Sequence, residues 1–372
     1  MILKYFVLRI ISFILHTHKK ILVAFLDWGL GHATRCMPII DVLLEKRHEV
    51  ILAGNGHSLL MMQQQYPDLK SYELPAYNIR YSGKRNAAWQ ILFQTRKIYK
   101  TIKQENISLK EIVEKENIQI IISDNRYGIY HPKCRNIFIS HQIAIQAPKT
   151  FRFTEPFLLK QILKLISKFD ELWIPDVADE CHNLSGELSH RIKFPIPVKY
   201  IGILSRFQKN IPISVIDDRR FNIVAIISGV EPSRSLFEEQ LLKELEKTEG
   251  ECLLICGKVE QEKRKTIHNN ITIINYLQGD ELVYYLRQAE IVICRSGYST
   301  IMDLLALEKK AILIPTPGQT EQEYLAKNLA AQNIVVYQKQ SDINLKEAID
   351  AIKSTEGFKN KTAFHFRKEA LD

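Results

Sequence analysis

A histidine follows two glycines in the stretch 27–39, DWGLGHATRCMPI. The apolar run 21–26 precedes it and a helical pattern follows, so Gly29 and Gly31 lie where a strand turns into a helix. Glycine lets the backbone approach a ligand closely, and a helix N-terminus binds anions through its free N–H groups. An imidazole in the first helical turn has an ordinary pKa near working pH, which suits a general base. His32 is therefore the candidate catalytic residue, and a purely structural turn is the alternative.

A second stretch with chemical potential is 294–328, CRSGYSTIMDLLALEKKAILIPTPGQTEQEYLAKN. A strand ends at its first residue, and the helix that follows can receive a phosphate at its N-terminus. Asp303 on that helix can accept the paired hydroxyls of a ribose, and Gln322 and Glu323 suit the hydroxyls of a sugar. The alternatives are that Asp303 only favours its own helix N-terminus, and that Gln322 and Glu323 are solvated first-turn residues.

Two basic groups have two interpretations each. Arg126, in the stretch 123–132 after a strand, either meets an anionic acceptor or forms a structural salt bridge. The helix expected over 155–168 carries three lysines beside apolar residues. Such a helix either lies on anionic lipid or covers a sheet with its lysines in water, and we favour the sheet.

The charge of the chain is uneven. Of 372 residues, the first 205 hold 28 Lys and Arg against 18 Asp and Glu, a balance of +10, while the remainder is at −1. This half therefore either meets a membrane surface or phosphorylated acceptor, or is a solvated basic surface without a partner. No basic run with interleaved aromatics and no zinc, RRM or KH signature indicates nucleic acid. Six scattered cysteines without a C-x-x-C pair predict reduced thiols in a cytoplasmic protein.

Residues 1–19 form an apolar and basic N-terminal extension. Lys4 and Arg9 interrupt it, so a membrane span is not expected, and no small-residue cleavage site marks a signal peptide. It is either an interfacial helix or an extension without a role.

Short apolar strands alternate with helical patterns along the rest of the chain, which predicts parallel sheets covered by helices. We expect an α/β protein with two Rossmann-like, doubly wound domains that face each other across a cleft. Their limits are 20–205 on the acceptor side and 221–372 on the donor side, where the last helix would pack back on the first domain, with a linker over 206–220. The expected strands are 21–26, 49–53, 118–123, 136–140, 171–174, 222–228, 252–256, 271–275, 291–294, 311–314 and 334–337.

The stretch 294–328 resembles the donor-binding segment of family 28 glycosyltransferases, the MurG-like enzymes. Their pattern is R-S/A-G, then Thr, an acidic residue and P-x-x-x-x-x-x-Q-x-x-N/A. The stretch 27–39 resembles the first glycine-rich loop of the family, and ISHQ at 139–142 resembles its acceptor-side H-E-Q-N motif. The residues SGVEPSR at 228–234 stand in the place of its second glycine-rich loop.

This resemblance implies the GT-B fold and assigns roles to residues. His32 would deprotonate or orient the acceptor hydroxyl, and the other acceptor-side residues would be Gly29, Gly31, Arg126, His141 and Gln142. The donor-binding residues would be Ser228, Gly229, Arg234, Arg295, Gly297, Ser299, Thr300, Asp303, Gln322 and Glu323. No metal is expected, because helix dipoles and basic side chains would stabilise the leaving diphosphate.

Several positions depart from the family pattern. Asp303 is one methylene shorter than the usual Glu, and Glu323 replaces a more usual Gln, which alters sugar preference. The loop at 228 has a single glycine, and ISHQ lacks the Glu and Asn of the family motif. The resemblance therefore implies the reaction class and not a muramyl-lipid acceptor.

We therefore expect an inverting, metal-independent hexosyl- or N-acetylhexosaminyltransferase that needs no cofactor. Its donor would be a nucleoside-diphosphate sugar, in the first place a UDP-sugar, and its acceptor a hydroxyl of a cell-envelope or lipid-linked glycan. It would act in the cytoplasm in peripheral contact with the inner face of the membrane, without nucleic acid. The alternatives are a nucleotide-sugar hydrolase, in which His32 activates water, and a non-catalytic nucleotide-sugar-binding protein.

Overall fold

The computed structural model describes residues 18–77, 95–207, 220–229, 231–258, 264–358 and 364–371. Its first half forms a seven-stranded sheet of order β3-β2-β1-β4-β5-β6-β7, in which every pair is parallel. These strands are β1 (Lys20–Phe25), β2 (Glu49–Gly54), β3 (Ser71–Glu73), β4 (Ile120–Asp124), β5 (Arg135–Ile139), β6 (Glu171–Ile174) and β7 (Val198–Tyr200).

The second half forms another seven-stranded sheet, of order β10-β11-β9-β8-β12-β13-β14. The edge strand β10 runs antiparallel to β11, and the other pairs are parallel. These strands are β8 (Phe221–Ile226), β9 (Cys252–Ile255), β10 (Lys265–His268), β11 (Ile271–Ile274), β12 (Ala289–Cys294), β13 (Lys310–Leu313) and β14 (Val336–Tyr337).

Helices cover both faces of each sheet, and strand β1 shows why. Successive side chains of a strand point to opposite faces, so Ile21, Val23 and Phe25 pack on one side while Leu22 and Ala24 pack on the other. Both faces are apolar and buried, as parallel strands require. The helices of the two sheets are α2 (Gly31–Glu45), α3 (Gly56–Gln65), α5 (Thr95–Glu116) and α6 (Glu155–Ile166) in the first half, and α7 (Ser233–Leu245), α8 (Gly279–Gln288), α9 (Tyr298–Ala306), α10 (Thr320–Ala331) and α11 (Leu345–Lys353) in the second.

The predicted α/β class with two parallel sheets is confirmed, and each expected strand overlaps an observed one. The sequence missed three short strands at or near sheet edges, β3, β7 and β10. Their residues are partly or fully exposed, so they carry no apolar run that would mark them. The helix expected over 155–168 begins and ends close to α6, whose Ile162 and Ile166 are buried against the sheet while its lysines are exposed.

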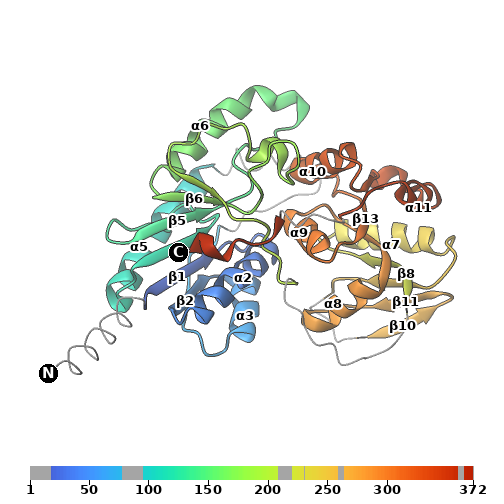
Figure 1. The fold of residues 1–372 in the computed structure, drawn as a ribbon, viewed down its shortest axis with the longest axis horizontal. Coiled ribbons are helices and arrows are strands. Elements are labelled where there is room, and N and C mark those ends of the chain that lie inside the picture. Colours follow the sequence, from blue (N-terminus) through green and yellow to red (C-terminus); the bar gives the residue numbers. More distant parts are fainter. Residues whose placement is uncertain are drawn as a thin grey trace, which may run out of the picture.

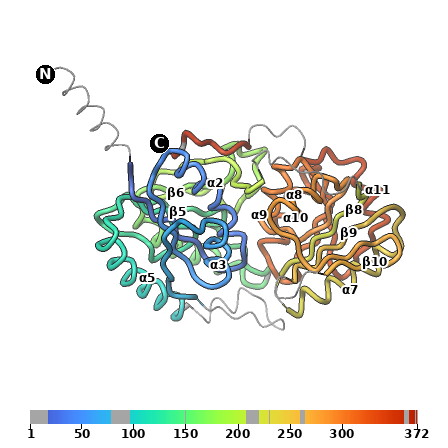
Figure 2. Tube along the Cα trace, turned by 90° about the horizontal axis from the view of Figure 1, so that it is seen from below, coloured from blue at the N-terminus to red at the C-terminus, as the bar shows by residue number. Residues whose placement is uncertain are grey.

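The chain crosses from the first sheet to the second at residues 201–207 and returns near its end. The N–H of Ile203 donates to the carbonyl of Phe364 at 2.9 Å, and that of Arg367 donates to Ile201 at 2.9 Å. In Figures 1 and 2 this last segment lies against the N-terminal half of the molecule. Residues 208–219, most of the expected linker, and residues 1–17 of the expected extension lie outside the described residues.

Candidate active site

The N-termini of α2 and α9 meet between the two halves of the molecule. Ser299 Oγ, in the first turn of α9, donates to the carbonyl of Gly31 at 3.0 Å. A Cβ atom on Gly31 would lie 2.8 Å from Ser299 Oγ and 3.3 Å from its Cβ. Glycine at position 31 therefore permits this contact, which joins the two stretches that the sequence singled out.

His32 pairs with a carboxylate at the carboxyl end of β4. Its Nδ1 lies 2.7 Å from Asp124 Oδ1, and 15% of the imidazole is exposed while the carboxyl is fully buried. Burial first, and then the Arg35 guanidinium, lower the pKa of His32, so the imidazole is neutral at pH 7. Burial works against the Asp124 carboxylate, yet Arg35 and His32 hold its pKa at about 2. This is the arrangement of an oriented, unprotonated general base.

Arg35 connects this pair to the second half of the chain. Its Nε and Nη2 donate to the two oxygens of Asp124, and its Nη1 lies 2.9 Å from His141 Nδ1. The other ring nitrogen of His141, Nε2, lies 2.7 Å from Glu321 Oε1 in the first turn of α10. The His141 ring stacks on Tyr298 of α9 with centroids 4.0 Å apart. One polar network therefore spans both halves.

Further contacts hold α10 against the first half. Thr320 Oγ1 donates to the carbonyl of Gln146 at 2.6 Å, and the N–H of Glu187 donates to the Tyr324 hydroxyl at 2.7 Å. These bonds lie on the helix that carries the predicted sugar-binding residues. The structure therefore has the two halves in direct contact at the expected cleft.

Asp303 lies in the second turn of α9 beside the crossing segment. Ser205 Oγ donates to its Oδ1 at 2.6 Å, and Arg206 Nε lies 3.7 Å from its Oδ2. Burial raises the pKa of Asp303 to about 6, although Arg206 and Ser205 work in the opposite direction. The carboxyl thus contacts residues that the sequence did not connect with it.

Gln322 and Glu323 brace the loop that precedes α10. Gln322 Oε1 accepts from the N–H of Thr316 at 2.8 Å, its Nε2 donates to Gln319 at 2.6 Å, and Glu323 Oε1 accepts from Gly318 at 3.2 Å. Both side chains are partly buried and lie one turn or less from Glu321. Their predicted sugar contacts stay predictions.

The predicted arginines of the donor site are held by protein groups. Arg295 is 2% exposed, stacks over Phe237 and donates to the carbonyls of Ile314 and Pro315. Arg234 donates to the carbonyl of Gly257 and pairs with Glu231 at 2.8 Å. Of the remaining predicted donor residues, Ser228 and Gly229 lie in the loop between β8 and α7, and Gly297 and Thr300 lie at the start of α9.

Arg126 requires a correction. Its side chain is fully buried, and it pairs with the equally buried Glu105 of α5 at 2.7 Å and donates to the carbonyl of Phe25. Asn125, which follows β4, has a left-handed backbone conformation, and the Arg126 side chain after it reaches α5. Arg126 therefore forms the structural salt bridge and does not line the acceptor side. Gln142 follows His141, and its N–H donates to Ser140 Oγ.

Sequence reasoning missed Arg35, and it did not connect Asp124 or Glu321 with His32. Arg35 is one turn after His32 on the same helix, Asp124 ends a strand, and Glu321 begins a helix. The spacing of His32 and Arg35, three residues, was a usable signal because such residues share a helix face. Nothing in the sequence indicates that Asp124, 92 residues from His32, is its partner.

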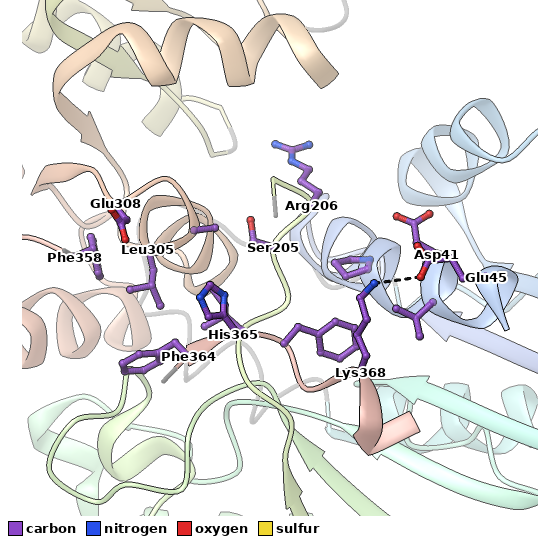
Figure 3. Close-up of a pocket in the computed structure, with 15 residues that line it drawn as sticks. Asp41, Glu45, Ser205, Arg206, Leu305, Glu308, Phe358, Phe364, His365 and Lys368 are labelled. Carbon is purple, nitrogen blue, oxygen red and sulfur yellow. Dashed lines mark hydrogen bonds and ion pairs between the residues drawn. The ribbon is translucent and has the colours of Figure 1, made fainter. Parts of the chain in front are cut away.

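A pocket of about 330 Å³ lies at the other ends of the same two helices (Figure 3). Late residues of α2 and α9, the crossing segment and the returning C-terminal segment line it, among them Asp41, Ser205, Leu305 and His365. Lys368 pairs with Glu45 across its rim at 3.2 Å. The pocket is therefore distinct from the meeting point of the helix N-termini.

Within the described ranges, no group of three or more His, Cys, Asp or Glu residues is placed to hold a metal ion. In the same part of the chain, no helix is both long and apolar enough to cross a membrane.

Residues 224–371 match the model of the glycosyltransferase family 28 C-terminal domain. An uncharacterised glycosyltransferase of Methanosarcina acetivorans is 24% identical over 318 residues, which cover 82% of this chain and 81% of the relative. The chain is a glycosyltransferase, and its C-terminal part is similar to family 28. This confirms the family resemblance of its sequence and its enzyme class.

Further comparisons agree with this glycosyltransferase having the GT-B fold. The spinosyn rhamnosyltransferase SpnG superposes with a TM-score of 0.64 at 16% identity, over 95% of this chain and 98% of that one. SpnG is also known in complex with thymidine diphosphate. A UDP-N-acetylglucosamine–N-acetylmuramyl-(pentapeptide) pyrophosphoryl-undecaprenol N-acetylglucosamine transferase of Bacillus licheniformis is 32% identical over 117 residues, 29% of this chain and 31% of that protein.

Proposed function

We propose that this glycosyltransferase moves a sugar, with inversion and without a metal ion, from a nucleoside-diphosphate sugar to an acceptor hydroxyl. The pairing of His32 with Asp124 at the α2 N-terminus carries the proposal. In the transfer, the acceptor oxygen forms a bond to the anomeric carbon as the bond to the diphosphate breaks. The acceptor proton goes to His32 Nε2.

The proton inventory of His32 supports its role as base. Arg35 Nη2 lies 2.8 Å from His32 Nδ1, but it already donates to Asp124 Oδ1, so His32 Nδ1 can donate to that carboxylate. Nε2 then keeps a lone pair, and the lowered pKa of His32 keeps the ring neutral at pH 7. The carboxylate then stabilises the imidazolium that forms during transfer. A positioned general base contributes about 10²- to 10⁴-fold to a rate.

The converging helix N-termini support a metal-free departure of the diphosphate. Neither α2 nor α9 has a side-chain cap on its first turn, and neither has an acidic residue there. The N–H groups and the positive dipole ends of both helices are thus available to the charge that develops on the leaving group. Gly297 at the start of α9 is the predicted point of closest approach.

For the donor, we propose a UDP-sugar that contacts Asp303 through its ribose and Gln322 and Glu323 through its sugar. The partial match to a UDP-N-acetylglucosamine transferase supports this choice, and thymidine diphosphate in SpnG supports a nucleoside diphosphate in general. The internal hydrogen bonds of the three side chains must then rearrange or be shared when the donor binds.

The test uses the purified protein with UDP-, GDP-, ADP- and dTDP-sugars, each with and without a membrane-lipid extract as acceptor. We expect acceptor-dependent release of nucleotide that persists in EDTA, with inverted anomeric configuration in the product by NMR. His32→Ala should lower the rate at least 10²-fold. The matched control is His182→Ala, which removes an exposed histidine paired with Asp179 at 3.3 Å. Equal rates for the two variants would contradict the role of His32.

The same assay separates the alternatives. Free sugar released without an acceptor would indicate a hydrolase, in which His32 activates water. Donor binding without turnover would indicate a binding protein. Unchanged donor binding by Asp303→Ala would contradict the proposed donor site.

We further propose that the acceptor is lipid-linked and that the enzyme works in the cytoplasm at the inner membrane surface. Phe153 and Phe157, before and in α6, are 77% and 60% exposed, and Arg152 and Lys160 beside them are exposed too. Exposed aromatic rings flanked by basic side chains bind the interface of anionic membranes.

The membrane proposal is tested by sedimentation with phosphatidylglycerol vesicles. Replacing Phe153 and Phe157 by Ser should reduce co-sedimentation, while Leu236→Ser, at a 53% exposed residue of α7, should not. Wild-type protein that stays in the supernatant would contradict it.

A further inference from the structure

Arg35 is almost fully buried, at 2% exposure, and all three nitrogens of its guanidinium have partners. Nε and Nη2 donate to the two oxygens of Asp124, and Nη1 is 2.9 Å from His141 Nδ1. This side chain thus contacts the proposed base pair and a second histidine at the same time.

The positions of the protons on His141 follow from the fact that a guanidinium only donates hydrogen bonds. Although burial acts against its charge, the Asp124 carboxylate raises the pKa of Arg35 further, so the group is charged and can only donate. His141 Nδ1 must therefore accept, and a neutral imidazole that accepts at Nδ1 carries its proton on Nε2. Nε2 lies 2.7 Å from Glu321 Oε1, which is an acceptor. At His141, each of the two contacts thus joins one donor to one acceptor.

We propose that Arg35 is a positioning residue that fixes His141 in its Nε2–H tautomer, so that His141 donates to Glu321 and ties α10 to the His32–Asp124 pair. The tautomer follows from the geometry alone. The catalytic consequence rests on the proposed function, because it assumes that α10 carries the donor sugar.

Arg35 controls the tautomer of His141 and not the orientation of its ring, because another residue already fixes the ring. Tyr298 stacks on the His141 ring at an interplanar angle of 10°, which keeps the ring plane fixed. The orientation of the His141 ring thus has an independent support, whereas Arg35 Nη1 is the donor that faces His141 Nδ1, at 2.9 Å. Arginine suits this position because its planar fork reaches Asp124 and His141 together.

The shared charge explains how two halves of the chain are coupled. Asp124 belongs to the first sheet and Glu321 to the helix after β13. Burial acts to raise the pKa of Glu321, but His141, His32 and Arg35 together lower it. One cation therefore supports carboxylates from both sides. Lysine at position 35 keeps the charge but, as a point donor, cannot hold Asp124 and His141 at once.

The first test measures the tautomer directly. Long-range ¹H–¹⁵N correlation spectra of protein labelled at its 11 histidines distinguish Nδ1–H from Nε2–H, and the signal lost in His141→Gln identifies His141. We expect Nε2–H in the wild type and a mixture of tautomers in Arg35→Lys. Arg126→Lys is the matched control, since it changes another buried, ion-paired arginine and should leave His141 unchanged. A His141 that is Nδ1–H in the wild type, or unchanged in Arg35→Lys, overturns the proposal.

The second test measures coupling through binding of UDP-N-acetylglucosamine by calorimetry. Arg35→Lys and Glu321→Gln should each weaken binding about tenfold, or about 1.4 kcal/mol, and the double variant should be no weaker than about tenfold. A hundredfold loss in the double variant would mean independent effects and overturn the coupling. A wild type that binds no nucleotide sugar contradicts the proposed function instead, and the spectra still decide the tautomer.

Discussion

Asp303→Asn should stabilise the protein at neutral pH while it weakens donor binding. Burial raises the pKa of this carboxyl to about 6 from an ordinary 3.8. The folded state therefore binds the proton more tightly than the unfolded state between about pH 4 and 6, and stability is lost as pH rises through this range. Two pKa units correspond to about 3 kcal/mol at pH 7. Asparagine removes this cost and keeps an acceptor for Ser205, and the attraction of Arg206 is already included in the pKa of about 6.

The expected gain is thus about 3 kcal/mol at pH 7.5, which corresponds to a rise of roughly 6–12 °C in the melting temperature of a domain of this size. At pH 4.5 the wild-type carboxyl is protonated in the folded state, so most of the gain should disappear. Melting curves at both pH values measure this, with Asp280→Asn at an exposed residue as the control. An equal shift at the two pH values, or destabilisation at pH 7.5, would refute the reasoning. Donor affinity, measured in parallel, should fall, as is usual where a strained charge serves function.

Three further outcomes are expected. Gly31→Ala should break the hydrogen bond from Ser299, lower the free energy of unfolding by about 1 kcal/mol and lower activity. Adding Ser299→Gly should restore activity, because it makes room for the new methyl group; melting curves and transfer assays measure the two effects. Asp124→Asn should lower kcat about 10²-fold or more, because the neutral amide no longer stabilises the imidazolium of His32. A change confined to KM would argue against an orienting role for Asp124. Arg126→Met should cost about 3–5 kcal/mol in unfolding experiments, since it leaves the Glu105 carboxylate buried without its partner. A stable Arg126→Met variant with altered acceptor preference would instead show that Arg126 contacts the acceptor.

The sequence predicted the core strands because burial on both faces demands near-continuous apolar runs. β1 is the clearest case, with five of its six residues buried and all five apolar. The exposed β10 has no such demand on its residue types, and it was not predicted. The chemistry-bearing stretches around His32 and Asp303 were found because a strand that turns into a helix leaves a recognisable glycine and hydroxyl pattern.

Partners of these residues could not be read in the same way. Asp124 and Arg126 lie two positions apart at the end of strand β4. Only the turn at Asn125 decides that one reaches His32 and the other enters an ion pair under α5. A backbone torsion of this kind depends on the packing of the whole sheet.

By itself the sequence predicted the two-sheet architecture, the resemblance to family 28 and His32 as the candidate base, because apolar periodicity and local motifs are properties of neighbouring residues. Only the tertiary structure decided which charges share a site. Arg35, His141 and Glu321 are separated by 106 and 180 positions along the chain and are brought within hydrogen-bond distance by the contact of α2, α9 and α10. Electrostatic pairing acts through space and leaves no periodic trace in the sequence, so the network that orients the proposed base became visible only in the folded molecule.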